Sequence, residues 1–326
     1  MILISKTIFR PLRLCDFARE IFHVKTQRRN EMKNWFLILI VAAASCTERI
    51  DVKTDDAPPR LVIYGYITTD TMQHTIRITR SAGYFTTGSP EGVSHAAVTI
   101  SDNDGKLIPL AENDTVPGLY QTAADVYGEE NKTYTLNVQL DFDGDRVPEH
   151  YQSSAYLTPI NHIDSVRLQG SHLFKNIVEV LLYAQDMPEE NFYSIFVRIN
   201  DSIVNPTINR FFVMDDVFFN GQYMNGVGCY YLNQDPDREN RNEILHVGDK
   251  VTLNINAISK EYATFISNVQ SEIRGSNPIF GGPPANVETN ILCVNPKDGI
   301  PVSGFFTAYP SRYASTIVKE EFILKK

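Results

Sequence analysis

Residues 132–140 read KTYTLNVQL and alternate apolar and polar side chains without a break. The apolar set on one side consists of Tyr134, Leu136, Val138 and Leu140. Successive side chains of a β-strand point to opposite faces of its sheet, so this alternation predicts a strand with one buried and one solvated face. The next segment, DFDGD at residues 141–145, is rich in turn-forming residues. We therefore predict a fold of short strands joined by tight turns.

The same period of two extends over residues 61–158. It is clear in LVIYGYIT at residues 61–68, in HTIRITR at residues 74–80 and in AAVTIS at residues 96–101. Asp102-Asn103-Asp104-Gly105 follows as a tight-turn signal. Strands separated by turns every 8–12 residues or so are typical of β-sandwiches, and no helical pattern is visible in this part. We predict an immunoglobulin-like β-sandwich for residues 61–158.

Pro159 marks a predicted boundary, beyond which residues 159–326 form a second β-rich, sandwich-like domain. NIVEVLLYAQD and NFYSIFVRIN are apolar over long stretches, which favours deeply buried strands. Asn220-Gly221 is the strongest hairpin signal in the chain. VSGFFTAY and ASTIVKEEFIL are predicted to close this domain as strands.

One amphipathic helix is predicted near residues 259–274. Its apolar side chains recur at i, i+3, i+4, i+7 and i+11, which places them on one helical face. They are Tyr262, Phe265, Ile266, Val269 and Ile273. Ser259 suits the N-cap position, and Gly275 suits the end of the helix.

Residues 32–46, MKNWFLILIVAAASC, have the layout of a bacterial lipoprotein signal peptide. Lys33 precedes a short apolar run, and small residues lead from that run to Cys46. The run is shorter than the roughly 20 apolar residues of a membrane-spanning helix. Its end resembles a lipobox, in which Ala43 replaces the usual leucine. We predict that residues 32–45 are the signal peptide and that the Cys46 thiol carries the lipid.

The segments on either side of this signal are predicted to lie outside the fold. Residues 1–31 are interpreted as an upstream extension, with an unusually long n-region as the alternative. Residues 46–60 are polar, end in two prolines before Arg60 and are predicted to be a flexible tether.

The chain is acidic, with a formal net charge of −9. The residues before Cys46 are net basic, so the remainder is more acidic still. Binding of nucleic acid requires an excess of positive charge, which this acidic chain does not have, so we predict no nucleic-acid partner. Anionic head groups would repel such a chain, and the lipid on Cys46 would have to hold it at a membrane.

The succession of these segments resembles the DUF4249 family of bacterial lipoproteins. The resemblance is carried by the lipobox, LVIYGYIT, SDNDG, GLYQT with KTYTLNV, PINHIDSV, DDVFFNG, ISKEYATFI, GGPPANVETNI and VSGFFTAYPS. It implies an outer-membrane lipoprotein whose gene commonly lies beside that of a TonB-dependent receptor. It implies no established activity and no catalytic residues.

No motif in the sequence predicts catalysis or a cofactor. Ser101-Asp102-Asn103 matches one triplet of the penicillin-recognising serine enzymes, but the Ser-x-x-Lys and Lys-Thr-Gly motifs of those enzymes are missing. The histidines lack the spacing of a helical zinc site, and no Gly-x-Ser-x-Gly is present. We interpret the triplet as part of a hairpin turn.

Asp141, Asp143 and Asp145 form a weak candidate for a calcium site. Alternating carboxylates can converge on a hard cation, but they are equally at home in a tight turn. Glu149 is too close to them for the spacing of an EF-hand, so any site would be irregular. We favour the hairpin turn.

The remaining chemistry-bearing residues leave alternatives open. Cys229 and Cys293 could form a disulfide in an exported protein, or could be two free cysteines. Thr71 and Thr115 lie in Asp-Thr-aliphatic triplets and in predicted turns, so they are candidate O-glycosylation sites.

Residues 277–290 form our predicted partner-binding loop. The loop is long, rich in Gly and Pro, and has no periodic reason to be apolar, yet it contains Ile279 and Phe280. Pro283 and Pro284 restrict its backbone, which lowers the entropy lost on docking. The alternative is that Phe280 packs onto the domain.

These observations lead to one functional hypothesis and two alternatives. We expect a non-enzymatic outer-membrane lipoprotein that serves as an accessory or ligand-delivering partner of a TonB-dependent transporter. A surface adhesive or structural β module is the first alternative. A hydrolase with a non-sequential active site is the second and less favoured one.

Overall fold

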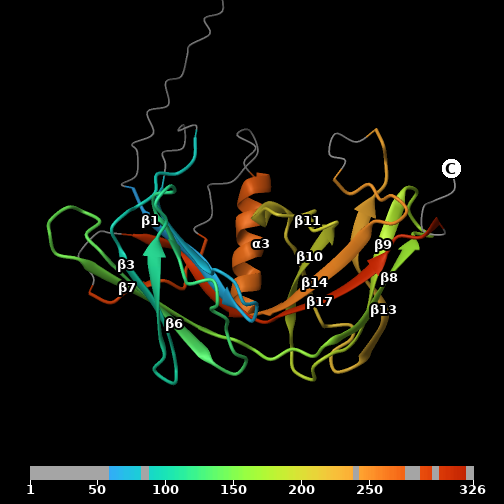
Figure 1. The fold of residues 1–326 in the computed structure, drawn as a ribbon, viewed down its shortest axis with the longest axis horizontal. Helices are drawn as coiled ribbons and strands as arrows, with labels where there is room; N and C mark the ends of the chain where they lie inside the picture. The colour runs from blue at the N-terminus through green and yellow to red at the C-terminus, as the bar shows by residue number, and fades with distance from the viewer. Residues whose placement is uncertain (1–58, 82–87, 238–241, 276–286, 296–300, 321–326) are drawn as a thin grey trace, which may run out of the picture. The chain divides into compact units, whose positions relative to one another are not determined.

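The computed structural model describes residues 59–81, 88–237, 242–275, 287–295 and 301–320 (Figure 1). These described residues form one compact unit. This unit is mainly β, and α3 (Lys260–Gly275) is the single α-helix among its described residues. No helix in this described part is long and apolar enough to cross a membrane.

Nine strands form the largest sheet, in the order β15-β7-β6-β3-β4-β5-β2-β1-β16. Their bounds are β1 Leu61–Thr68, β2 Thr75–Arg80, β3 Ala97–Asp102, β4 Leu107–Glu112, β5 Leu119–Gln121, β6 Thr133–Leu140, β7 Glu149–Tyr156, β15 Leu292–Cys293 and β16 Val302–Tyr309. The sheet curls until β16, at one end of this order, also lies against β7 near the other end. The nine-stranded sheet is therefore nearly closed.

The step that nearly closes the sheet is a parallel pairing between the first strand and a late one. β1 and β16 run side by side over their full lengths, from Leu61 opposite Val302 to Thr68 opposite Tyr309. The sheet therefore combines strands from both sides of the boundary predicted at Pro159. The immunoglobulin-like sandwich predicted for residues 61–158 is not confirmed, and the division at residue 159 stays a prediction.

Two smaller sheets complete the unit. In the five-stranded sheet, named the second sheet below, the order is β11-β10-β14-β17, and β12 pairs with β10. In the three-stranded sheet the order is β13-β9-β8. Their bounds are β8 Ile163–Gly170, β9 Ile177–Gln185, β10 Phe192–Ile199, β11 Ser202–Ile203, β12 Phe212–Asp215, β13 Tyr223–Asn233, β14 Lys250–Ile258 and β17 Ser311–Ile317, with a 3-10 turn, η1, at Ile208–Arg210. A shared apolar core joins these two sheets.

The alternation of the sequence sets which side of each strand enters the core. In β6, Tyr134, Leu136, Val138 and Leu140 are buried in the core of the nine-stranded sheet, as predicted. β14 behaves differently, because Val251 to Ile258 are buried on both faces of their strand. Asn254 and Asn256 therefore lie inside the molecule, although a half-buried strand would have exposed them.

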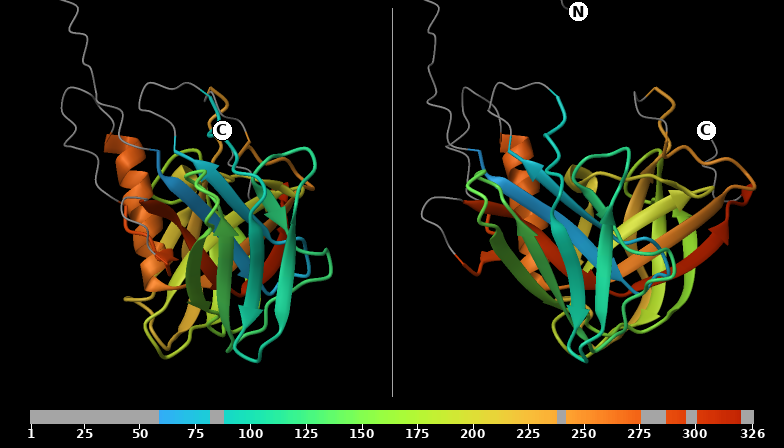
Figure 2. Two further views of the ribbon diagram at one scale, coloured as in Figure 1. Left: turned by 90° about the vertical axis from the view of Figure 1, so that its left-hand side faces the viewer. Right: turned by 60° about the vertical axis from the view of Figure 1, so that its left-hand side comes forward.

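The predicted helix is confirmed as α3. The Ser259 hydroxyl accepts a hydrogen bond from the Tyr262 backbone N–H at 3.1 Å, which is the N-cap contact. Tyr262, Phe265 and Ile266 pack in an apolar cluster with Phe305 of β16. Ile273 was predicted on the same face but is 47% exposed, because the cluster ends before the last turn of the helix. Figure 2 shows α3 running beside the strands.

The prediction of a β-hairpin at Asn220-Gly221 is wrong, because the strands on the two sides of the turn do not pair with each other. The chain does turn there, with Gly221 at φ 68°, but the flanking strands belong to different sheets. β12 pairs with β10, and β13 pairs with β9. The Asp216 carboxylate accepts a hydrogen bond from the Asn191 backbone N–H at 2.8 Å, which ties the turn to the start of β10.

The nine-stranded sheet and the second sheet are connected directly by the end of the chain. β16 ends at Tyr309, and β17 begins at Ser311 in the other sheet, with only Pro310 between them. Proline has no backbone N–H to donate, so it is suited to the point where a strand leaves its ladder. This crossing brings β1 and β16 close to β10, β14 and β17.

Candidate ligand-binding cleft

A cleft of about 200 Å³ lies where the nine-stranded sheet meets the second sheet. β1 and β16 contribute one wall, β10, β14 and β17 contribute the other, and α3 contributes Tyr262. The strand crossing at Pro310 and the packing of α3 place these elements together. Five tyrosines line the cleft: Tyr64, Tyr66, Tyr262, Tyr309 and Tyr313.

The tyrosines are held by one another as well as by their strands. The Tyr64 and Tyr262 hydroxyl oxygens lie 2.6 Å apart and share a hydrogen bond. The Tyr309 ring stacks against Tyr66 at 5.8 Å between centroids and against Tyr262 at 6.4 Å. Such contacts fix the ring orientations, so the wall of the cleft is preorganised.

Three polar residues of the lining on the second sheet are almost completely buried. Asn254 is 6% exposed, Asn256 is 1% exposed and Ser311 is 7% exposed. The Asn256 side-chain oxygen accepts hydrogen bonds from Asn254 Nδ2 at 3.1 Å and from the Ser311 hydroxyl at 2.8 Å. Asn256 Nδ2 donates to the Ser194 hydroxyl at 3.2 Å. The amides are therefore fixed in a network, which avoids the cost of burying an unpaired polar group.

Two charged side chains also line the cleft. Asp70, between β1 and β2, accepts a hydrogen bond from the Tyr313 hydroxyl at 2.5 Å. Arg198, on β10, is half-buried. In the part of the chain that the structure describes, its guanidinium forms no ion pair and no hydrogen bond. A guanidinium carries five donor N–H groups, so Arg198 offers the cleft an unused cationic site.

The hydroxyls of the cleft remain protonated at neutral pH. Burial raises the pKa of Tyr64 and of Tyr66, and it raises the pKa of Tyr262 and of Tyr309 well above the ordinary value. Burial and the hydrogen bond to Asp70 raise the pKa of Tyr313 to about 12, against the opposing charge of Arg198. The five tyrosines of the cleft are therefore neutral phenols and not phenolates.

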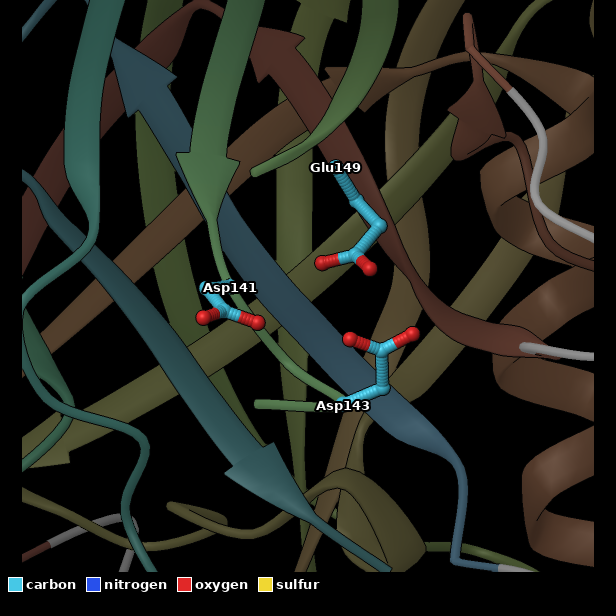
Figure 3. A group of neighbouring side chains, drawn as sticks. All are labelled: Asp141, Asp143 and Glu149. Carbon is cyan, nitrogen blue, oxygen red and sulfur yellow. The ribbon is translucent and has the colours of Figure 1, made fainter. Parts of the chain in front are cut away.

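The predicted calcium candidate is a hairpin turn, as favoured, but with a different third acid. β6 and β7 are joined by residues 141–148, and their pairing places Leu140 opposite Glu149. This brings a carboxylate oxygen of Glu149 within 4.8 Å of oxygens of Asp141 and Asp143 (Figure 3). Glu149 was set aside on EF-hand spacing, because sequence distance does not measure proximity across a hairpin.

The carboxylates of this turn already serve its backbone. Asp141 accepts hydrogen bonds from the N–H groups of Gly144 and Arg146, both at 2.8 Å. Asp145, the third residue of the sequence candidate, accepts one from the Val147 N–H at 2.7 Å and is not in the group of converging acids. The turn accounts for these contacts, and three converging carboxylates are ligands that a hard cation such as Ca²⁺ could also use.

Several predicted site residues lie outside the described residues. They are the lipidation site Cys46 and the partner-loop residues Ile279, Phe280, Pro283 and Pro284. Their roles stay predictions. The two candidate glycosylation sites, Thr71 and Thr115, are exposed between strands, so both are accessible to modification.

The two cysteines within the fold are free in the structure. Cys229 is fully buried between β13 and β9, and its Sγ donates to the Val180 carbonyl oxygen at 3.2 Å. Burial raises the pKa of its thiol to about 12, so it behaves as a small core side chain. Cys293 is half-buried in β15.

The cleft was missed because its residues are scattered along the sequence. The alternation of LVIYGYIT puts Tyr64 and Tyr66 on the side of β1 that faces away from the core of the nine-stranded sheet, and α3 and the second sheet partly cover that side. Asn254 and Asn256 in LNINA carried a usable signal, since two amides within a strand whose neighbours are all apolar suggest a buried polar surface. Nothing in the sequence connects these two segments.

Comparison with known proteins places the chain in a family. No curated protein sequence matches it. A family model matches residues 47–313, well over half of the chain, and that match begins directly after Cys46. It also includes every residue that lines the cleft. The chain therefore belongs to the family described as domain of unknown function DUF4249.

Proposed function

We propose that this protein is a non-enzymatic, lipid-anchored module of the outer membrane that binds a small ligand and serves a TonB-dependent transporter as an accessory partner. The observation that carries the binding role is the cleft between the two sheets. Its lining offers ring faces, hydroxyls, amides and one free guanidinium, all of which are recognition groups. Pre-formed clefts with a few fixed polar groups are the usual form of a small-molecule site.

The anchoring role is supported by the sequence that precedes the fold. The lipobox-like residues end at Cys46, and residues 47–60 have the composition of a tether. An acidic chain gains little from anionic head groups, so stable attachment needs covalent lipid. A transporter partner is supported by the genomic setting that is common in the family.

Cys46→Ala should release the protein from the membrane fraction into the periplasmic fraction. The diacylglycerol attached to the thiol supplies the membrane affinity, and alanine cannot carry it. Cell fractionation followed by immunodetection measures the change. Cys293→Ala is the matched control and should remain with the membrane. If the Cys46 variant also remains there, lipid anchoring through this residue is refuted.

Affinity purification of the protein from detergent-solubilised outer membranes should recover a TonB-dependent receptor. An accessory partner must contact the transporter, and mild detergent keeps such a complex together. Mass spectrometry of the eluate identifies the receptor, and an unrelated lipoprotein with the same tag is the control. Equal recovery of the receptor with both baits would reject the partnership.

A further inference from the structure

The cleft contains a cation that the fold itself does not use. Three arginines of the described residues form ion pairs with carboxylates: Arg80 with Glu91, Arg210 with Glu243, and Arg312 with Glu130. Arg198 has no such partner among the described residues, although it is half-buried beside Phe196 and Tyr313 in the cleft lining. A partly desolvated guanidinium without an anion costs free energy, and a bound anion would recover it.

The one carboxylate in the cleft is already engaged. Asp70 accepts the Tyr313 hydroxyl, and no ion pair joins it to Arg198 in the described part of the chain. The amide of Asn256 is likewise occupied by Ser194, Ser311 and Asn254. The group with most donors to spare is therefore Arg198, and its geometry suits the two oxygens of a carboxylate.

The opposite wall fits a flat ring. Tyr66, Tyr262 and Tyr309 form a stacked series, and the Tyr309 hydroxyl donates to no described residue. Tyr262 is almost fully buried, so Tyr66 and Tyr309, which are half-buried, are the rings of this series that a ligand can reach. Tyrosine rings pack against the apolar faces of aromatic rings and of sugar rings, and a hydroxyl without a partner can bind a polar substituent. The cavity of about 200 Å³ lies below the range of about 300–1,000 Å³ that drug-sized ligands occupy, so the ligand is small.

We propose that the cleft binds a small organic acid whose carboxylate pairs with Arg198 and whose ring packs against the tyrosine wall at Tyr66 and Tyr309. This inference rests on the proposed binding function and names the ligand class. The same chemistry is present in an aromatic acid and in an acidic sugar. Both carry a carboxylate on or near a six-membered ring that has an apolar face.

Isothermal titration of the full-length protein in detergent tests the proposal with three probes. They are 3-phenylpropionate, glucuronate and the neutral amide 3-phenylpropionamide. We expect saturable binding of at least one acid, and binding of the amide weaker by about 10- to 100-fold, as expected for a lost charged hydrogen bond. Saturation by phenylpropionate alone would identify an aromatic acid, and saturation by glucuronate alone would identify an acidic sugar.

Arg198→Gln should weaken binding of the preferred acid by about 10- to 100-fold and should leave binding of the neutral amide unchanged. Arg198→Lys should restore part of the affinity, because it keeps the charge without the planar fork. Arg167→Gln is the matched control, since Arg167 stacks on Tyr183 outside the cleft, and it should bind like the wild type. Thermal melts of the variants show that each remains folded.

Three outcomes would overturn the proposal: neither acid binds, the amide binds as tightly as the acid, or Arg198→Gln binds the acid like the wild type. None of these results bears on whether Cys46 anchors the protein or on whether a receptor co-purifies. The ligand class and the transporter partnership can therefore fail separately.

Discussion

Gly304→Ala should destabilise the protein by about 4 kcal/mol, a large part of the roughly 5–15 kcal/mol that stabilises an ordinary domain. Gly304 lies in β16 directly opposite Ile63 of β1. A Cβ atom at this position would lie 2.0 Å from the Ile63 carbonyl oxygen and 2.9 Å from its nitrogen. Both contacts are with backbone, so no side chain can rotate away, and the two strands would have to separate.

Gly105→Ala is the control that separates the effect of the close contact between Gly304 and Ile63 from the effect of a positive φ angle. Both glycines have positive φ, 106° for Gly304 and 87° for Gly105, but a Cβ atom at Gly105 meets nothing within 4 Å. The control should cost only the conformational penalty of about 1–2 kcal/mol. Chemical denaturation of both variants, with soluble yield as a second readout, measures the difference. Equal losses would show that the β1–β16 contact does not constrain the chain at this point.

Local structure was predictable because it depends on neighbouring residues. The alternation in residues 132–140 placed the buried face of β6 correctly, since a strand has a fixed period of two. The spacing of Tyr262, Phe265 and Ile266, with a serine before them, predicted α3 and its cap. Asp102 was predicted to serve a turn, and it accepts hydrogen bonds from the N–H groups of Asp104 and Lys106.

The arrangement of the strands was not predictable from such patterns. VSGFFTAY was predicted as a strand, but nothing local indicates that it pairs in parallel with a strand at the beginning of the fold. A glycine inside a strand indicates that another backbone approaches closely. Gly304 gives that indication, but the sequence does not show which strand approaches. The same limit applies to Asn220-Gly221, where the turn was recognised but the strands on its two sides pair elsewhere.

The cleft is harder still to predict, because it depends on two tertiary features. One is the parallel pairing of β1 with β16, and the other is the passage of the chain from β16 in one sheet to β17 in the other. Tyr66, Arg198, Asn256 and Tyr309 come from four strands, and they meet only because Pro310 separates two consecutive strands that belong to different sheets. Alternation distinguishes two faces of a strand but does not say what covers the second face. Tyrosines and amides occur both on solvent-exposed faces and on buried faces of strands, so the composition of such a face does not decide whether it is covered. Only the tertiary structure decides between these states.

The packing of α3 leads to the second large prediction. Ile266→Ala should lower the free energy of unfolding by about 2–5 kcal/mol, and Phe265→Ala should lower it by a similar amount. Ile266 is fully buried, and the Phe265 ring lies 4.9 Å from the Phe305 ring of β16. Each truncation removes buried apolar surface and leaves a cavity between the helix and the nine-stranded sheet. Urea denaturation followed by far-ultraviolet circular dichroism gives both values.

The choice of control for this experiment follows from what the other face of α3 contacts. The period of the helix alone suggests Gln270 as a neutral position, but its side-chain amide donates to the Ile208 and Phe211 carbonyl oxygens at 2.9 and 2.8 Å. Gln270→Ala should therefore cost about 1–3 kcal/mol, because two acceptors lose their donor. Ser267 is exposed and its side chain forms no hydrogen bond with another described residue, so Ser267→Ala should change stability by less than about 0.5 kcal/mol. If Ser267→Ala and Ile266→Ala unfold at the same urea concentration, α3 does not pack on β16 through this face, and the wall that carries Tyr262 is not fixed in the way the cleft requires.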